Sequence, residues 1–171
     1  MAAMIAFPVS AQDLFDLYQN SVSKAPFVAF LARNSPGATG APGHSFVGFG
    51  VELDNGLTVY ENLLGFHPKG GGYEVVKAVF SSTSGELKSV IEDVAWDVEL
   101  RVYPSDSQFQ SAKSVVQTWM SDAPKYNLFA ENGKNCSVFA SEVAAAMGLN
   151  VPDGPGSKLP ITFISEMKDI N

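Results

Sequence analysis

The chain has 171 residues, of which 46% are hydrophobic and 17% are charged. This length is enough to bury one sizeable core but short for two domains, so we expect a single domain spanning residues 1–171. The formal net charge of −7 and the absence of a basic stripe argue against a nucleic-acid partner, because phosphate backbones are bound by clustered Lys and Arg.

The first half of the chain predicts mainly strands. A capped amphipathic helix is expected from Ser10 to about Ser23, followed by a strand at 27–33 and a Pro- and Gly-rich loop at 34–43. The segments 44–53 and 57–66 are rich in β-branched and aromatic residues, and Asp54-Asn55-Gly56 between them favours a tight turn. We therefore expect a β-hairpin that begins at His44.

The second half mixes strands and helices. Further strands are predicted at 73–80 and 87–93, and the alternating segment 96–103 is typical of a half-buried strand. Apolar periodicity predicts helices at 106–121 and 136–147, the second ended by Gly148, and either a strand or a helix at 161–167. The expected fold class is α+β, with an antiparallel sheet against the helix that bears Cys136.

Cys136 is the only cysteine of the chain, so it can form no internal disulfide. It is predicted at the point where a polar loop becomes a helix. There the positive end of the helix dipole favours the thiolate, and backbone amides of the first turn can receive an oxyanion. The alternative is a small buried apolar residue, which is a common environment for free cysteine.

His44 is the first candidate for a base that serves such a thiolate. It follows a Pro-Gly segment and begins the predicted hairpin, a place where an imidazole can be held rigidly and still face a cleft. The alternative is a structural or surface histidine at the end of a strand.

A third group should orient the imidazole by accepting a hydrogen bond from its other nitrogen. If the turn is centred on Asn55, paired residue numbers sum to about 110, and His44 then shares a face of the hairpin with Asn62. Glu61 and His67 fall on the other face unless a β-bulge shifts the register, which Gly65 makes conceivable. The third member is thus Asn62, Glu61, His67 or none, with Asn62 favoured by parity.

No metal or cofactor is predicted. The chain has no pair of histidines or cysteines at metal-ligand spacing and no acidic calcium loop. The three glycines at 70–72 lack the Lys and Ser or Thr that complete a phosphate-binding loop.

Three short motifs, taken together, resemble permuted NlpC/P60-like (papain-like) cysteine hydrolases, in which the histidine strand precedes the cysteine helix. The likeness spans roughly His44 to Pro152 and is closest to bacterial domains associated with type VI secretion. The motifs are Gly43-His44-Ser45-Phe46-Val47, Leu64-Gly65-Phe66-His67-Pro68 and Asn135-Cys136-Ser137-Val138-Phe139-Ala140.

The resemblance implies that Cys136 is the nucleophile and His44 the base, and that Tyr126, Asn135 and His67 line the substrate cleft. His67 departs from the pattern, which favours a bulky aromatic residue at that position, and an obvious third acid or histidine is missing. The implied function is hydrolysis of a peptidoglycan stem amide by an antibacterial effector, and the resemblance implies an immunity protein as its partner.

Localisation follows from the same resemblance. The N-terminus lacks the basic region of a signal peptide, so we expect delivery by a signal-independent route into a target cell's periplasm, or residence in the producer's cytoplasm. No apolar stretch approaches the roughly 18 residues that span a bilayer, so no stable membrane insertion is expected.

Two other functions remain open at this point. The second enzymatic function keeps the same site but acts on lipid esters or transfers acyl groups, as permuted relatives of the lecithin:retinol acyltransferase type do. The non-enzymatic alternative is a binding or adaptor domain, which predicts a buried, inert Cys136 far from His44 and a raised thiol pKa.

Overall fold

The computed structural model describes residues 24–34, 43–70, 73–90, 95–128 and 133–171. Within these ranges the strands are β1 (Lys24–Arg33), β2 (His44–Leu53), β3 (Thr58–Pro68), β4 (Thr83–Ser89), β5 (Val98–Val102) and β6 (Lys125–Tyr126). The helices are α2 (Tyr73–Phe80), α3 (Asp106–Asp122), α4 (Cys136–Ala146) and α5 (Pro160–Asp169). The α+β class is confirmed.

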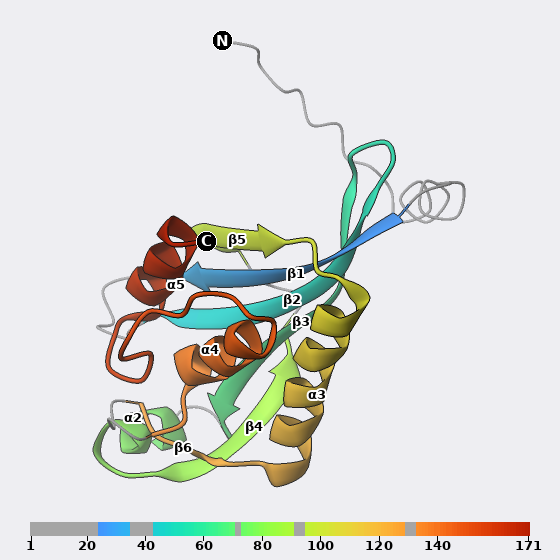
Figure 1. Ribbon diagram of the computed structural model, residues 1–171. Helices are drawn as coiled ribbons and strands as arrows, with labels where there is room; N and C mark the ends of the chain where they lie inside the picture. The colour runs from blue at the N-terminus through green and yellow to red at the C-terminus, as the bar shows by residue number, and fades with distance from the viewer. Residues whose placement is uncertain (1–23, 35–42, 71–72, 91–94, 129–132) are drawn as a thin grey trace.

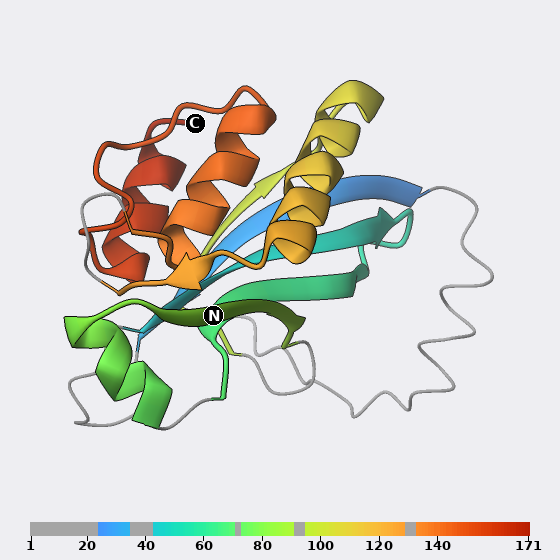
Figure 2. The ribbon, with the colours of Figure 1, turned by 90° about the horizontal axis from the view of Figure 1, so that it is seen from below.

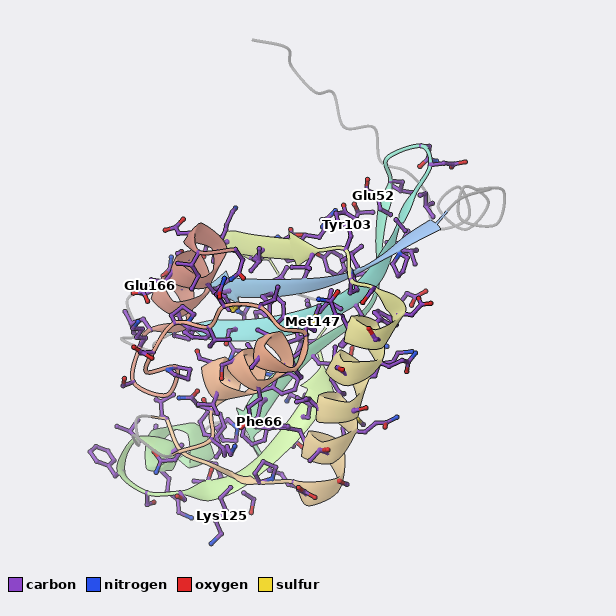
Figure 3. All side chains as sticks on the ribbon, viewed as in Figure 1. Glu52, Phe66, Tyr103, Lys125, Met147 and Glu166 are labelled. Atoms are coloured by element: carbon purple, nitrogen blue, oxygen red, sulfur yellow. The ribbon has the colours of Figure 1, made fainter. Side chains whose placement is uncertain are left out.

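The described strands form one antiparallel sheet in the order β5-β1-β2-β3-β4-β6 (Figure 1). Helices α3, α4 and α5 cover one face, and α2 lies on the other side of the sheet (Figure 2). The helix-covered face holds the larger core, to which β1 contributes Val28 and Phe30 and α4 contributes Phe139 and Val143. Phe66 lies between the sheet and these helices (Figure 3).

The opposite face of the sheet carries a second, smaller apolar cluster. Its members alternate along the strands with those of the larger core, because successive side chains of a strand point to opposite faces. Tyr60 and Val90 pack against it, and its buried residues are Phe27, Ala29, Leu31, Phe46 and Leu63. Each strand of the central hairpin therefore serves two apolar layers.

The hairpin register changes once, at a β-bulge. Near the turn Gly50 pairs with Tyr60, as expected from a turn centred on Asn55, but Phe49 pairs with Asn62, which leaves Glu61 as an extra residue in β3. Side chains of β3 beyond the bulge therefore face the other way from the expectation, because one inserted residue reverses parity.

The helices α3 and α4 start where their sequences provide caps. Ser105 forms a capping box with Gln108 at the start of α3, and the Asn135 side chain caps α4. Gly148 follows α4 with φ +77°, a conformation that favours glycine. The predictions for these two helices are confirmed to within two residues.

The structure differs from the predictions for three other segments, or does not describe them. The strand expected at 73–80 is wrong, because this segment is the helix α2, in which Ala78 is buried while Val76, Val79 and Phe80 are exposed. A segment of eight residues whose apolar positions are interrupted by Glu74 and Lys77 does not by itself distinguish helix from strand. The segment 161–167 belongs to a helix, and the strand at 87–93 corresponds to the end of β4, with 91–93 outside the described residues. The helix expected from Ser10 also lies outside them.

Gly50→Ala should strongly destabilise the fold, because a Cβ there would lie 2.3 Å from the Val59 carbonyl oxygen and 2.5 Å from the Phe27 ring beside the bulge. We expect a loss of about 2–4 kcal/mol in urea unfolding. Gly56→Ala is the matched control: its φ is +79° but its Cβ meets nothing within 4 Å, so about 1 kcal/mol is expected. Equal losses would show that the close approach at the bulge is absent.

Candidate functional site

Cys136 is the first residue of α4 and is only 2% exposed. Its thiol lies beside the polar groups of Ser45 on β2 and Ser137 on α4, and the Tyr126 hydroxyl also lies beside it. The two serine hydroxyls are 3.4 Å apart and fully or almost fully buried. The thiol is therefore surrounded by polar groups where α4 packs against the sheet.

Asn135 fixes the start of α4. Its side-chain oxygen accepts hydrogen bonds from the backbone N–H groups of Ser137 and Val138, both at 3.0 Å. Its side-chain nitrogen donates to the carbonyls of Leu128 at 2.9 Å and Gly156 at 3.0 Å. One buried amide thus caps the helix and ties two loops to it, which uses all its usual hydrogen-bonding groups.

The segment before Asn135 is anchored by a second polar group. Lys134 forms an ion pair with Glu142 of α4, and its ammonium group lies 5.2 Å from the centre of the Trp119 ring. The Trp119 indole N–H donates to the same carboxylate at 2.7 Å. The backbone of Lys134 also forms an isolated β-bridge with Tyr126. Contacts of Lys134 therefore join β6, α3 and α4 immediately before Cys136.

The Cys136 thiol is neutral in this environment. Burial raises its pKa, and the hydrogen bonds from Ser45 and Ser137 oppose this effect. Burial and the neighbouring Cys136 also raise the pKa of the Tyr126 hydroxyl. The sequence prediction that the helix dipole would favour a thiolate is thus outweighed here by desolvation.

His44 and His67 form a hydrogen-bonded pair. Their Nε2 atoms are 3.1 Å apart, so one ring donates and the other accepts. Both rings lie over Gly65, where a Cβ would come within 2.8 Å of His44 and 2.6 Å of His67. The absence of a side chain at Gly65 makes room for the two imidazoles.

Both imidazoles are neutral over most of the pH range. Burial is the largest cause that lowers the pKa of each to about 3, and the charges of Arg33 and Lys88 lower it further. Glu86 lies opposite His67 in β4 but pairs with Lys88 at 3.7 Å.

The described geometry does not bring Cys136 and His44 together. The His44 ring packs against Phe46, with ring centres 4.7 Å apart, on the face that bears the smaller apolar cluster. The thiol lies beside Ser45, the residue after His44, whose side chain points to the helix-covered face and contacts Ser137 of α4. Thiol and imidazole therefore lie against opposite faces of the same strand segment, and no hydrogen bond joins them in the described part of the chain.

Two predicted roles need correction. Asn62 does not orient His44, because the bulge at Glu61 places it opposite Phe49 on the helix-covered face, whereas His67 takes the position beside His44. Asn135 offers no free group to a substrate, because its amide is engaged within the protein. Tyr126 does lie beside Cys136, as expected for a residue that shapes the site.

Sequence reasoning missed Ser45 and Ser137. Each directly follows a predicted catalytic residue, and strand alternation alone places Ser45 on the face opposite to His44. A hydroxyl on a face that packs against apolar helices needs a partner, and that requirement is the signal that could have pointed to it.

Comparisons of the chain with family models, with curated proteins and with solved structures gave no match. Among the described residues no group of three or more His, Cys, Asp or Glu side chains is placed to hold a metal ion. No helix in those same ranges is both long and apolar enough to cross a membrane.

Asn135→Ala should cost about 2–4 kcal/mol, because it removes a helix cap and leaves the buried Leu128 and Gly156 carbonyls without their donor. Asn135→Asp keeps the cap acceptor but not the donor, and it buries a charge, so it should also destabilise. Chemical unfolding measures both. A cost below 0.5 kcal/mol for Asn135→Asp would show that the two carbonyl contacts contribute little.

Acid should destabilise the fold through the histidine pair. Between the unfolded pKa of 6.5 and the folded value of about 3, the unfolded chain binds protons that the folded chain excludes, so stability falls as pH falls across this window. Each histidine should contribute up to about 1.4 kcal/mol per pH unit.

The measurement is urea unfolding from pH 7 to pH 4 for the wild type and for the double variant His44→Gln/His67→Gln. The double variant should lose clearly less stability on acidification. An NMR titration of the ring C–H signals, of which the chain has only two sets, should show both imidazoles neutral at pH 5. Ordinary titration near pH 6.5 would contradict the buried pair.

Proposed function

We propose that this protein is a cysteine hydrolase of the permuted papain-like kind, with Cys136 as nucleophile and His44, oriented by His67, as base. The observation that carries the proposal is the pair of neutral imidazoles that begins directly before Ser45, the residue beside the thiol. The chain order, with a histidine strand before a cysteine helix that lies against an antiparallel sheet, supports the same kind of fold.

In the proposed reaction the resting pair is a neutral thiol and a neutral imidazole. As Sγ of Cys136 attacks a carbonyl carbon, the thiol proton passes to His44, which then gives it to the leaving amine. Water hydrolyses the resulting thioester and restores the thiol. The second imidazole, His67, holds the ring of His44 in one orientation, as the third member of a triad does.

The first turn of α4 contributes less to the oxyanion than its position suggests. The N–H groups of Ser137 and Val138 donate to the Asn135 side chain, and that of Phe139 donates to the Asn135 carbonyl. In the proposal, the Cys136 N–H is therefore the donor that this turn offers to an oxyanion.

Catalysis by this pair requires a rearrangement at the start of β2. Proton transfer needs heavy atoms within about 3.2 Å, and the imidazole and thiol lie against opposite faces of the strand. In the proposal, substrate binding exposes the Cys136 thiol beside Ser45 and brings the His44 imidazole into contact with the thiol. The energy for this step comes from substrate contacts.

The proposed substrate is an amide of a peptidoglycan stem peptide, cleaved by an effector delivered into a competitor's periplasm. This part rests on the resemblance of the three motifs to cysteine hydrolases associated with type VI secretion. Lipid esters are the alternative substrate for the same site, and a lipid assay beside the muropeptide assay separates them.

A second candidate function is a binding or adaptor domain with a structural thiol. The 2% exposure of Cys136, its raised pKa and the lack of a described bond to His44 favour this candidate. It predicts that Cys136→Ser and His44→Gln change stability but no reaction rate.

The test is cleavage of purified muropeptides by the wild type and by variants, followed by mass spectrometry of new amino termini. Cys136→Ser should abolish cleavage, His44→Gln should lower kcat/KM by about 10²–10⁴-fold, and His67→Gln should lower it less, because His67 acts through His44. Since both imidazoles stay neutral above about pH 3, the wild-type rate should vary little between pH 5 and 8.

Ser141→Ala is the matched control, because this buried hydroxyl of α4 donates to the Val138 carbonyl and contacts neither the thiol nor the imidazoles. It should leave kcat/KM within about twofold. Full activity in Cys136→Ser would refute the nucleophile, and full activity in His44→Gln would refute the base. No turnover of muropeptides or lipid esters, with iodoacetamide alkylation of Cys136 slow and unchanged by His44→Gln, would favour the binding domain.

A further inference from the structure

A cluster of lysines lies at the end of the sheet beside α2, outside the site described above. Ser84 of β4 pairs with Lys125 of β6, and the Lys69 N–H donates to the Ser84 carbonyl at 2.7 Å. The pairing of Pro68 with Gly85, continued by one residue, places Lys69 opposite Ser84. Lys69, Ser84 and Lys125 thus form one cross-strand row whose side chains share a face of the sheet.

The row lines an open pocket of about 480 Å³. Lys77 and Glu74 of α2 and the hydroxyl-bearing residues Ser82 and Thr83 complete its lining. Lys77 pairs with Glu74 at 3.6 Å, whereas Lys69 and Lys125 form no ion pair with any other described residue. Three ammonium groups and one carboxylate give the lining a charge of about +2 in a protein whose formal net charge is −7.

We propose that this pocket binds a phosphate group. A phosphate dianion matches the charge of the lining, and its oxygens accept the charge-assisted hydrogen bonds that Lys69, Lys125 and the neighbouring hydroxyls donate. The volume exceeds that of the ion, so the group can belong to a larger phosphate ester. Concentrating positive charge in one pocket of an acidic surface attracts such an anion selectively.

The pocket is separate from the thiol. Lys125 and Tyr126 are adjacent in β6, so their side chains point to opposite faces of the sheet, and Tyr126 contacts Cys136 on the helix-covered face. Figure 3 shows Lys125 at the outer end of the molecule, below α2 and β4. Phosphate binding can therefore be tested without any assumption about catalysis.

The experiment is a titration of the full-length, isotope-labelled protein with inorganic phosphate and with glycerol 2-phosphate, followed by NMR of the backbone amides. Sodium chloride at equal ionic strength is the reference. We expect saturable shifts at Lys69, Ser84 and Lys125 with at least one of the two phosphates, and the comparison between them shows whether the free ion or the ester binds better. Shifts that do not saturate, or that chloride reproduces, would overturn the proposal.

Variants test the charges one at a time. Lys69→Gln and Lys125→Gln should each weaken phosphate binding about tenfold, and Glu74→Gln should strengthen it severalfold because it removes the opposing carboxylate and frees Lys77. Lys168→Gln, an exposed lysine in the last turn of α5, is the control and should change affinity less than twofold. An equal effect of all three lysine substitutions would show that only net charge matters and would refute a defined site.

Discussion

One extra residue in β3 decides which side chains of the central hairpin share a face. Near the turn the pairing of β2 and β3 follows the simple hairpin register, but Glu61 shifts it by one position. Because side chains alternate along a strand, this shift carries His67 to the side of His44 and Asn62 to the side of the helices. The histidine pair, the space over Gly65 and the composition of both apolar layers all depend on that single insertion.

The surroundings of the thiol depend on a second constraint, the buried amide of Asn135. It caps α4 and holds the loops at Leu128 and Gly156, while Lys134 and Glu142 fix the preceding segment. A helix that begins so firmly places Cys136 with little freedom. The same cap occupies amides that would otherwise be free to stabilise an oxyanion, so rigidity at this helix start limits its chemistry.

The imidazole of His44 and the thiol of Cys136 lie on opposite faces of β2. His44 and Ser45 are consecutive, yet the first faces a neutral imidazole and two cations and the second faces a neutral thiol. Burial keeps both partners uncharged, so the resting protein has no thiolate and imidazolium pair. A hydrolase built this way would depend on substrate to create the ion pair, whereas a binding domain would keep the thiol as part of its core.

Farther along the face of the sheet that bears the histidines, the row of Lys69, Ser84 and Lys125 adds a region of positive charge that neither function requires.

The sequence by itself determined the elements whose signals are local. The turn at Asp54-Asn55-Gly56, the strand at 98–102 and the helices begun by Ser105 and Asn135 depend on turn residues, alternation and caps, which act over a few positions. It also placed Cys136 at the first turn of a helix. Only the tertiary structure decided that 73–80 is a helix, that His67 and not Asn62 contacts His44, and that the thiol faces Ser45 and not an imidazole. The register shift at the bulge, the helical conformation of 73–80 and the burial of the thiol are set by contacts between residues distant in the chain. Such contacts leave no local pattern in the sequence.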